Sequence, residues 1–125
     1  MIPAETVLDP GPIPYAEIAL YGDPDLEHAL REDGFQPDKT RYRLLELPLA
    51  AITDTKTMPW PWPVGRSYVE AIEAGHEFPP IVVVRNIRGS DWRLLDGCNR
   101  TYAYWTLGKA SILAYELLTG YHLAS

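Results

Sequence analysis

The sequence predicts a compact single domain of the α+β class, with helices packed on a small mixed sheet. The chain has 125 residues, of which 46% are hydrophobic and 22% are charged, and this suits one globular domain. Helix signals and β-branched runs follow one another in the order helix, strand, helix, strand, strand, helix, strand. Because two strands are adjacent in this order, we expect a hairpin rather than the regular alternation of a doubly wound sheet.

The first forty residues are predicted to be an N-terminal extension with one short helix. Four of the twelve prolines fall within residues 3–14, where we expect an extended arm, because proline fixes φ and removes a backbone donor. Asp23 and Pro24 are typical of a helix start, and the helix predicted from them covers residues 24–33, with Gly34 as its end. The predicted division is an extension, 1–40, which packs on the domain or is used for pairing, and the domain itself, 41–125.

The domain is predicted to hold four strands and two helices, the second helix following a β-hairpin. Ser67 followed by Glu70 has the pattern of a capping box, which predicts the start of the first helix, and Gly75 predicts its end. The β-branched run IVVVRN is typical of a central strand, and the turn after it makes WRLLDG its hairpin partner. Asn99 or Thr101 then opens the second helix. The predicted ranges are 41–47, 67–74, 81–86, 92–97, 100–107 and 111–118.

Charge and composition disfavour several kinds of partner. Seventeen acidic against eleven basic residues give a net charge of −6, whereas binding to nucleic acid needs a positive footprint. No apolar run reaches about 18 residues and no signal peptide is evident, so we expect neither a membrane span nor export. A single cysteine fits a reducing compartment, and the expected location is cytoplasmic. No metal site is predicted, because His28, His76 and His122 are far apart and one cysteine completes no zinc pattern.

The turn between the hairpin and the next helix, residues 96–101, is the candidate binding site. Backbone N–H groups at a helix start have no partner within the helix, and the helix dipole is positive there, so the place suits an anion. Gly97 lets a ligand approach the backbone, and the planar fork of Arg100 suits phosphate oxygens. Asn99 and Thr101 add neutral hydrogen-bonding groups. The turn therefore predicts phosphate binding, although such turns also occur without a ligand.

Cys98, the only cysteine of the chain, lies in this turn. A helix start lowers the pKa of a thiol and raises its thiolate fraction, which would make Cys98 a nucleophile beside a bound phosphate. The alternative is an inert, buried cysteine that packs like a small apolar residue. The residues alone leave both interpretations open.

Residues 79–117, from PPIVVVRN through LLDGCNRTYAYW to ILAYEL, resemble the ParB N-terminal/sulfiredoxin superfamily. Its members have a strand that starts at proline, a hairpin, a Gly-x-His-Arg signature at a helix start, and a closing strand. The sulfiredoxin branch has Gly-Cys-His-Arg, which Gly97-Cys98-Asn99-Arg100 matches at three of four positions. Residues 45–52 and the helix after them are similar to the family's leading strand and first helix, so the resemblance covers about 45–117.

This resemblance implies a ParB/sulfiredoxin-like fold with a pocket for ATP or another nucleotide, with or without Mg²⁺. It implies that the phosphates lie against Gly97, Asn99 and Arg100, joined by a hydroxyl from the first helix, which Ser67 would supply. A plain helix cap is the alternative role for Ser67. Cys98 would be the sulfur nucleophile that the sulfiredoxin branch uses in sulfinic acid reduction.

Two departures from the sulfiredoxin pattern favour phosphate binding over sulfinic acid repair. Asn99 replaces the motif histidine, and Leu47 replaces the arginine that sulfiredoxins place before the proline of the leading strand. Asp96, followed by glycine, is closer to other branches, which include a nucleotide-dependent amino acid kinase. Phosphoryl transfer needs a metal and an acidic base, for which Asp96, Glu46 and Asp54 are candidates.

The segment PWPWPVGR, residues 59–66, is unlike the family. Trp60 and Trp62 would stack on a base, with Arg66 facing phosphate. The favoured interpretation is that both rings cover an edge of the core. One or two of the three aromatic side chains in the last helix must also face the core: Tyr102, Tyr104 and Trp105.

The predicted function is that of a nucleotide- or phosphate-binding protein, whose partner is a nucleotide or another phosphorylated small molecule. If it is an enzyme, it is a small-molecule kinase or a sulfiredoxin-like reductase, acting by phosphoryl transfer or through Cys98. A non-catalytic module that senses a ligand, or binds a protein through the Pro/Trp-rich segments, is the alternative. A partition or nuclease-like DNA-binding protein is a further one, which the net charge disfavours.

Overall fold

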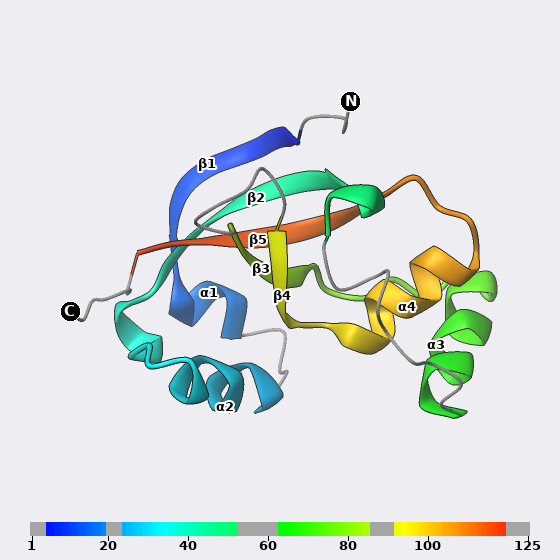
Figure 1. Ribbon diagram of the computed structural model, residues 1–125, viewed down its shortest axis with the longest axis horizontal. Coiled ribbons are helices and arrows are strands. Elements are labelled where there is room, and N and C mark those ends of the chain that lie inside the picture. Colours follow the sequence, from blue (N-terminus) through cyan, green and yellow to red (C-terminus); the bar gives the residue numbers. More distant parts are fainter. Residues whose placement is uncertain (1–4, 20–23, 53–62, 86–91, 120–125) are drawn as a thin grey trace.

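The computed structural model describes residues 5–19, 24–52, 63–85 and 92–119. They form an α+β domain on one five-stranded sheet (Figure 1). In spatial order its strands are β1 (Thr6–Pro14), β2 (Arg41–Pro48), β5 (Ser111–Thr119), β3 (Ile81–Arg85) and β4 (Trp92–Asp96). The pair β3 and β5 is parallel and the other neighbours are antiparallel, so the sheet is mixed, as predicted.

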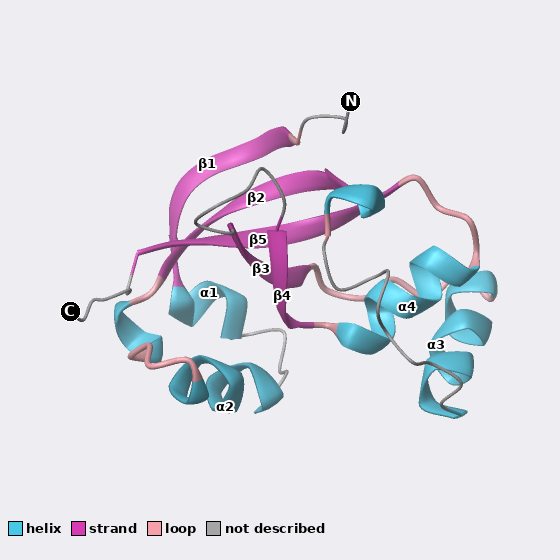
Figure 2. Ribbon diagram, viewed as in Figure 1, coloured by secondary structure: helices cyan, strands magenta, loops and turns pink. Residues whose placement is uncertain are grey.

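Helices cover both faces of this sheet (Figure 2). Because strand side chains alternate between faces, the sheet supports two apolar clusters. Leu45 and Ala114 belong to the first, against which Tyr104 packs, whereas Tyr42 and Leu117 belong to the second. Helices α1 (Tyr15–Ala19) and α2 (Pro24–Glu32) cover the second cluster, α4 (Cys98–Thr106) covers the first, and α3 (Pro63–Glu73) packs against α4.

Most predicted elements of the domain are confirmed. The four predicted strands start at the predicted residues, and β3 lies inside the sheet with Ile81–Val84 buried. β3 and β4 pair as the predicted hairpin, whose turn lies outside the described residues. The predicted helix over 24–33 is α2, although its expected cap, Asp23, also lies outside that part of the chain. No helix among the described residues is long and apolar enough to cross a bilayer.

The N-terminal extension contributes a strand and a helix that the sequence pattern did not predict. Its proline-rich arm pairs with β2 as the edge strand β1, and its register shifts between Val7 and Asp9 and again between Asp9 and Ile13. Edge strands and bulges are the places where a sheet tolerates proline, which explains why the arm pairs despite its composition. The boundary predicted between residues 40 and 41 stays a prediction. The extension shares its sheet and one apolar cluster with the rest of the chain.

Two predicted helix starts were wrong. α3 begins at Pro63, so Ser67 lies inside the helix and does not form the predicted capping box. Proline is well suited to a first helical position because its φ is already helical. α4 begins at Cys98 rather than at residue 100, because Gly97 is the N-cap. The predicted end of α3 is correct, with Gly75 at φ 95° directly beyond the last turn.

Candidate functional site

A single glycine joins strand β4 to helix α4. Gly97 has φ 107° and ψ 30°, in the left-handed region that glycine adopts without strain. As the N-cap it has no side chain to bond to the first amides of the helix. Cys98 is the first residue of α4 and is exposed, so its interpretation as a buried packing residue is wrong. The thiol therefore lies at the positive end of the helix dipole.

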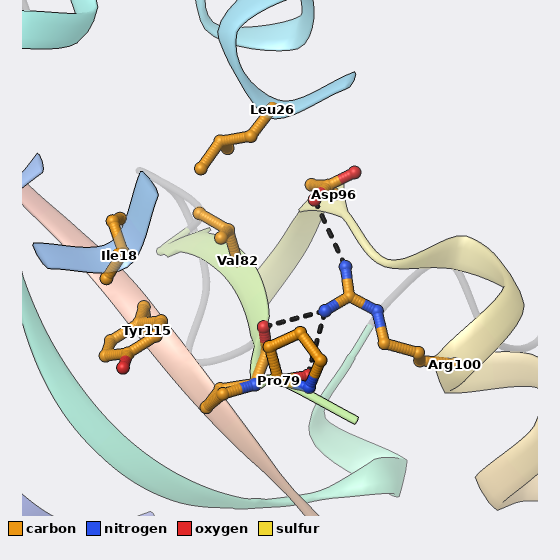
Figure 3. Close-up of a pocket in the computed structure, with 8 residues that line it drawn as sticks. Ile18, Leu26, Pro79, Val82, Asp96, Arg100 and Tyr115 are labelled. Carbon is orange, nitrogen blue, oxygen red and sulfur yellow. Dashed lines mark hydrogen bonds and ion pairs between the residues drawn. The ribbon is translucent and has the colours of Figure 1, made fainter. Parts of the chain in front are cut away.

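The side chain of Arg100 points into the protein (Figure 3) and is 7% exposed. Its Nη1 donates to the carbonyl oxygens of Pro79, at 2.8 Å, and Pro80, at 3.0 Å. Its Nη2 donates to Oδ2 of Asp96 at 3.1 Å. These acceptors lie just before β3 and at the end of β4, so the guanidinium ties the start of α4 to both strands. The fork predicted for phosphate oxygens thus bonds to oxygens of the chain itself.

Gly97 is also required by close packing. A β-carbon at this position would lie 2.5 Å from Cγ2 of Ile81 and 3.1 Å from Nη2 of Arg100. The sequence pattern predicted that a ligand would approach the backbone in the space beside this glycine. In the structure Ile81 and Arg100 occupy it.

Thr101 and Asn99, the other two polar residues of the turn, differ in whether their side-chain oxygens have hydrogen-bond partners. Thr101 is fully buried, and its Oγ1 donates to the carbonyl oxygen of Gly97 at 2.9 Å, so this hydroxyl is used inside the first helical turn. Asn99 is half-buried, and its buried Oδ1 accepts no hydrogen bond within the described part of the chain. Because buried oxygens are normally paired, Asn99 is the residue of the turn with acceptor capacity to spare.

Three further predicted residues lie beside the turn or on the neighbouring helix. Asp96 pairs with Arg100, and its side chain is 11% exposed. Ser67 is exposed on α3, which packs against α4. Arg66 belongs to α3 as well, but its side chain lies outside the described residues.

The remaining residues singled out from the sequence lie on β2, on α4 or outside the described residues. Glu46 lies on β2, where it accepts a hydrogen bond from Oγ of Ser111 at 2.7 Å. Leu47 is fully buried in the core. Of the aromatic side chains in α4, Tyr104 packs on the core, as expected for one of them, and Trp105 is exposed. Asp54, Trp60 and Trp62 lie outside the described residues.

A small cavity of about 20 Å³ lies between the Asp96–Arg100 pair and the N-terminal extension (Figure 3). Ile18 of α1 and Leu26 of α2 line its apolar side. This volume is enough for one water molecule. No sequence pattern indicated this cavity, because Ile18 and Leu26 have the pattern of ordinary core residues in short helices. Within the described ranges, no three His, Cys, Asp or Glu side chains are grouped so as to hold a metal ion.

Comparison with known proteins gives similarity to solved structures and no match of sequence. No family model matches the sequence, and no curated protein matches it. Among solved structures, the chain is similar to the crystal structure of sulfiredoxin from Arabidopsis thaliana, with 24% sequence identity and a TM-score of 0.46. The match covers 58% of this chain and 82% of the sulfiredoxin. The α+β fold class is established by the strands and helices themselves.

Proposed function

We propose that this protein binds a nucleotide or another phosphorylated small molecule at the turn from Asp96 to Thr101, with Cys98 as the nucleophile of its chemistry. One observation carries the proposal. The exposed thiol of Cys98 lies at the first position of α4, directly after a glycine N-cap without a side chain. Amide donors at such a helix start suit an anion, and the same dipole favours a thiolate.

The residues of the turn have different roles in this proposal. Backbone N–H groups of the first helical turn bind phosphate oxygens, and the side-chain amide N–H groups of Asn99 donate to them as well, because its Oδ1 can only accept. Arg100 supports the site rather than contacting the ligand. Its guanidinium bonds to the backbone and to Asp96 and so holds the turn in place. Ser67 and Arg66 of the neighbouring helix are the proposed additional contacts, with Mg²⁺ carried on the phosphates of the nucleotide.

Thiol chemistry fits this site better than phosphoryl transfer. A phosphoryl transferase needs an acidic base that reaches the acceptor, whereas the carboxylate of Asp96 is largely buried in its pair with Arg100. The second described candidate, Glu46, is on β2. Cys98 is exposed and therefore available to a substrate.

Ligand-dependent melting of two charge variants tests the binding site. At least one of ATP, ADP, CTP and GTP, tested with and without Mg²⁺, should raise the melting temperature of the native chain by about 10 °C at about 100 times its dissociation constant. Cys98→Asp should lose this shift, because a carboxylate at the helix start competes with phosphate while still suiting the helix dipole. Gln36→Glu adds the same charge at an exposed position and should keep the shift. An unchanged shift in Cys98→Asp contradicts the proposed site.

The reactivity of Cys98 separates an enzyme from a binding module. The rate of alkylation by iodoacetamide should reach half its maximum below the ordinary thiol pKa of about 8.5, because a helix start favours the thiolate. The nucleotide that raises the melting temperature should slow this alkylation. If alkylation of Cys98 has the pH dependence of an ordinary thiol while the nucleotide still raises the melting temperature, the chain is a non-catalytic binding module.

A further inference from the structure

Four charged side chains form a closed ring of ion pairs on the sheet. Arg43 lies 2.7 Å from Glu116 and 3.6 Å from Glu5. Arg85 lies 3.1 Å from Glu5 and 3.8 Å from Glu116. These distances join nitrogen to oxygen, so each carboxylate faces both guanidinium groups. We call these four residues the charged ring.

The charged ring continues one face of the sheet beyond its apolar cluster. Arg43 and Glu116 are directly opposite each other in β2 and β5, two residues along from Leu45 and Ala114 in the core. Alternate residues of a strand share a face, so the ring lies beside the cluster that α4 covers. Arg85 ends β3, the strand whose first residue packs on Gly97, so the ring and the proposed nucleotide site lie at opposite ends of this strand.

Arg43 and Glu116, the inner half of the charged ring, have a structural role. The side chain of Glu116 is only 7% exposed. Both Nε and Nη2 of Arg43 lie 2.7 Å from its Oε1, which is the length of a strong charge-assisted hydrogen bond. This carboxylate is therefore committed to Arg43, and the two strands are joined through it.

The outer half has the geometry of a ligand site. Glu5 directly precedes the edge strand β1, and its Oε2 lies 3.1 Å from Arg85 and 3.6 Å from Arg43, which are longer contacts than the 2.7 Å between Glu116 and Arg43. Arg85 lies over the ring of Trp92, with 4.2 Å from its Cζ to the ring centre, and this cation–π contact holds the guanidinium beside the ring. Nε1 of Trp92 is buried and has no acceptor in the described part of the chain.

The charged ring without Glu5 carries a net positive charge. Without Glu5, the two arginines and Glu116 leave one net positive charge in a chain whose total is −6. The side chains of Arg43 and Arg85 are 24% and 39% exposed, so an ion from solvent can reach them. Ion pairs at such exposure are weak and are easily exchanged for another anion.

We propose that Arg43 and Arg85 form a seat for an external oxyanion, a carboxylate or a phosphate group, and that Glu5 occupies this seat in the free protein. The proposal does not depend on the nucleotide site at α4. One carboxylate oxygen between two guanidinium groups reproduces the contact that arginine pairs make with oxyanions. An oxyanion ligand therefore displaces Glu5 and, with it, the start of β1.

Titration of the arginine Nε–H signals by NMR tests this seat. Inorganic phosphate and, separately, acetate are added at an ionic strength of about 10 mM, at which screening is weak. The signals of Arg43 and Arg85 should move, and Glu5→Gln should bind about tenfold more tightly than the native chain. Glu5→Asp shortens the competing side chain and should bind with intermediate affinity. Tighter binding of acetate assigns a carboxylate ligand, and tighter binding of phosphate assigns a phosphate group.

Two variants make the result decisive. Glu46→Gln removes a carboxylate that pairs with Ser111 rather than with an arginine, so it changes the net charge equally and should keep the native affinity. Arg85→Lys in the Glu5→Gln chain keeps the charge but loses the fork, and should weaken binding about tenfold. Equal affinities of Glu5→Gln and Glu46→Gln, or signals of Arg43 and Arg85 that do not move, would overturn the proposal and leave the ring with a structural role only.

Discussion

Asp96 and Arg100 are a pair of buried opposite charges at the centre of the turn. Their side chains are 11% and 7% exposed, and the guanidinium also bonds to the carbonyl oxygens of two consecutive prolines. A buried pair gains little over a well-packed apolar one, but removal of one member leaves the other charge without compensation. The pair therefore fixes the turn, and through it the position of Cys98, more than it adds to stability by itself.

Loss of this arginine should destabilise the protein strongly. Arg100→Ala leaves a buried carboxylate and two carbonyl groups without this donor, and should lower the free energy of unfolding by about 3–5 kcal/mol. Arg31→Ala is the matched control, because Arg31 pairs with Glu27 at the surface, where both side chains are more than half exposed. That substitution should cost less than about 1 kcal/mol. Urea denaturation measures both values, and similar losses would refute the role given to Arg100.

The link between β4 and α4 depends on one glycine for two separate reasons. Gly97 needs a left-handed backbone, and it also needs an empty β-position beside Ile81. Gly34, after α2, needs only the backbone conformation, because its φ is 88° and a β-carbon added there would meet no atom within 4 Å. Substitutions at these two glycines therefore distinguish the free-energy cost of a left-handed backbone from the cost of a steric clash.

Alanine at these two positions should give unequal losses. Gly34→Ala should cost about 1–2 kcal/mol, the strain of a left-handed non-glycine residue. Gly97→Ala should cost this amount and about 1–3 kcal/mol more, because its β-carbon would lie 2.5 Å from Ile81. Chemical denaturation of both variants measures the difference. Equal losses would mean that Ile81 moves aside without cost.

The elements that the sequence predicted well have strong local patterns. β3 has an uninterrupted β-branched run after two prolines, and α2 ends at a glycine with positive φ. β1 was not predicted as a strand because its prolines indicate an unpaired arm. Its pairing depends on the neighbouring strand β2, which the local sequence does not show. The start of α4 was misplaced because a left-handed glycine can itself be the N-cap, a choice that the residues after it do not reveal.

The sequence proposes a position for the site but not an arrangement of its side chains. The motif around Gly97 identified the turn from its own residues. The direction of the Arg100 side chain was not predictable, because its acceptors at Pro79 and Pro80 are about twenty residues away in the sequence. The charged ring joins residues still farther apart, and no spacing pattern announces such contacts.

The stability of the whole molecule should fall at alkaline pH because of Tyr42. Burial raises the pKa of Tyr42 to about 12, and its hydroxyl donates to Oγ1 of Thr40 at 2.8 Å. An unfolded chain ionises this group near pH 10, so its contribution is complete below pH 10 and is lost between about pH 10 and pH 12. Urea denaturation of Tyr42→Phe should show a weaker loss across this range than the native chain.

The last described strand, β5, occupies the middle of the sheet. β5 lies between β2 and β3, and no other described strand joins the β1–β2 pair to the β3–β4 pair. During translation β2 and β3 therefore have no partner on the side that β5 later covers, and they stay open there until residue 119 has been synthesised. Unpaired edges of this kind invite association with other nascent chains. We therefore expect the open edges of β2 and β3 to need shielding from other chains until β5 has been synthesised.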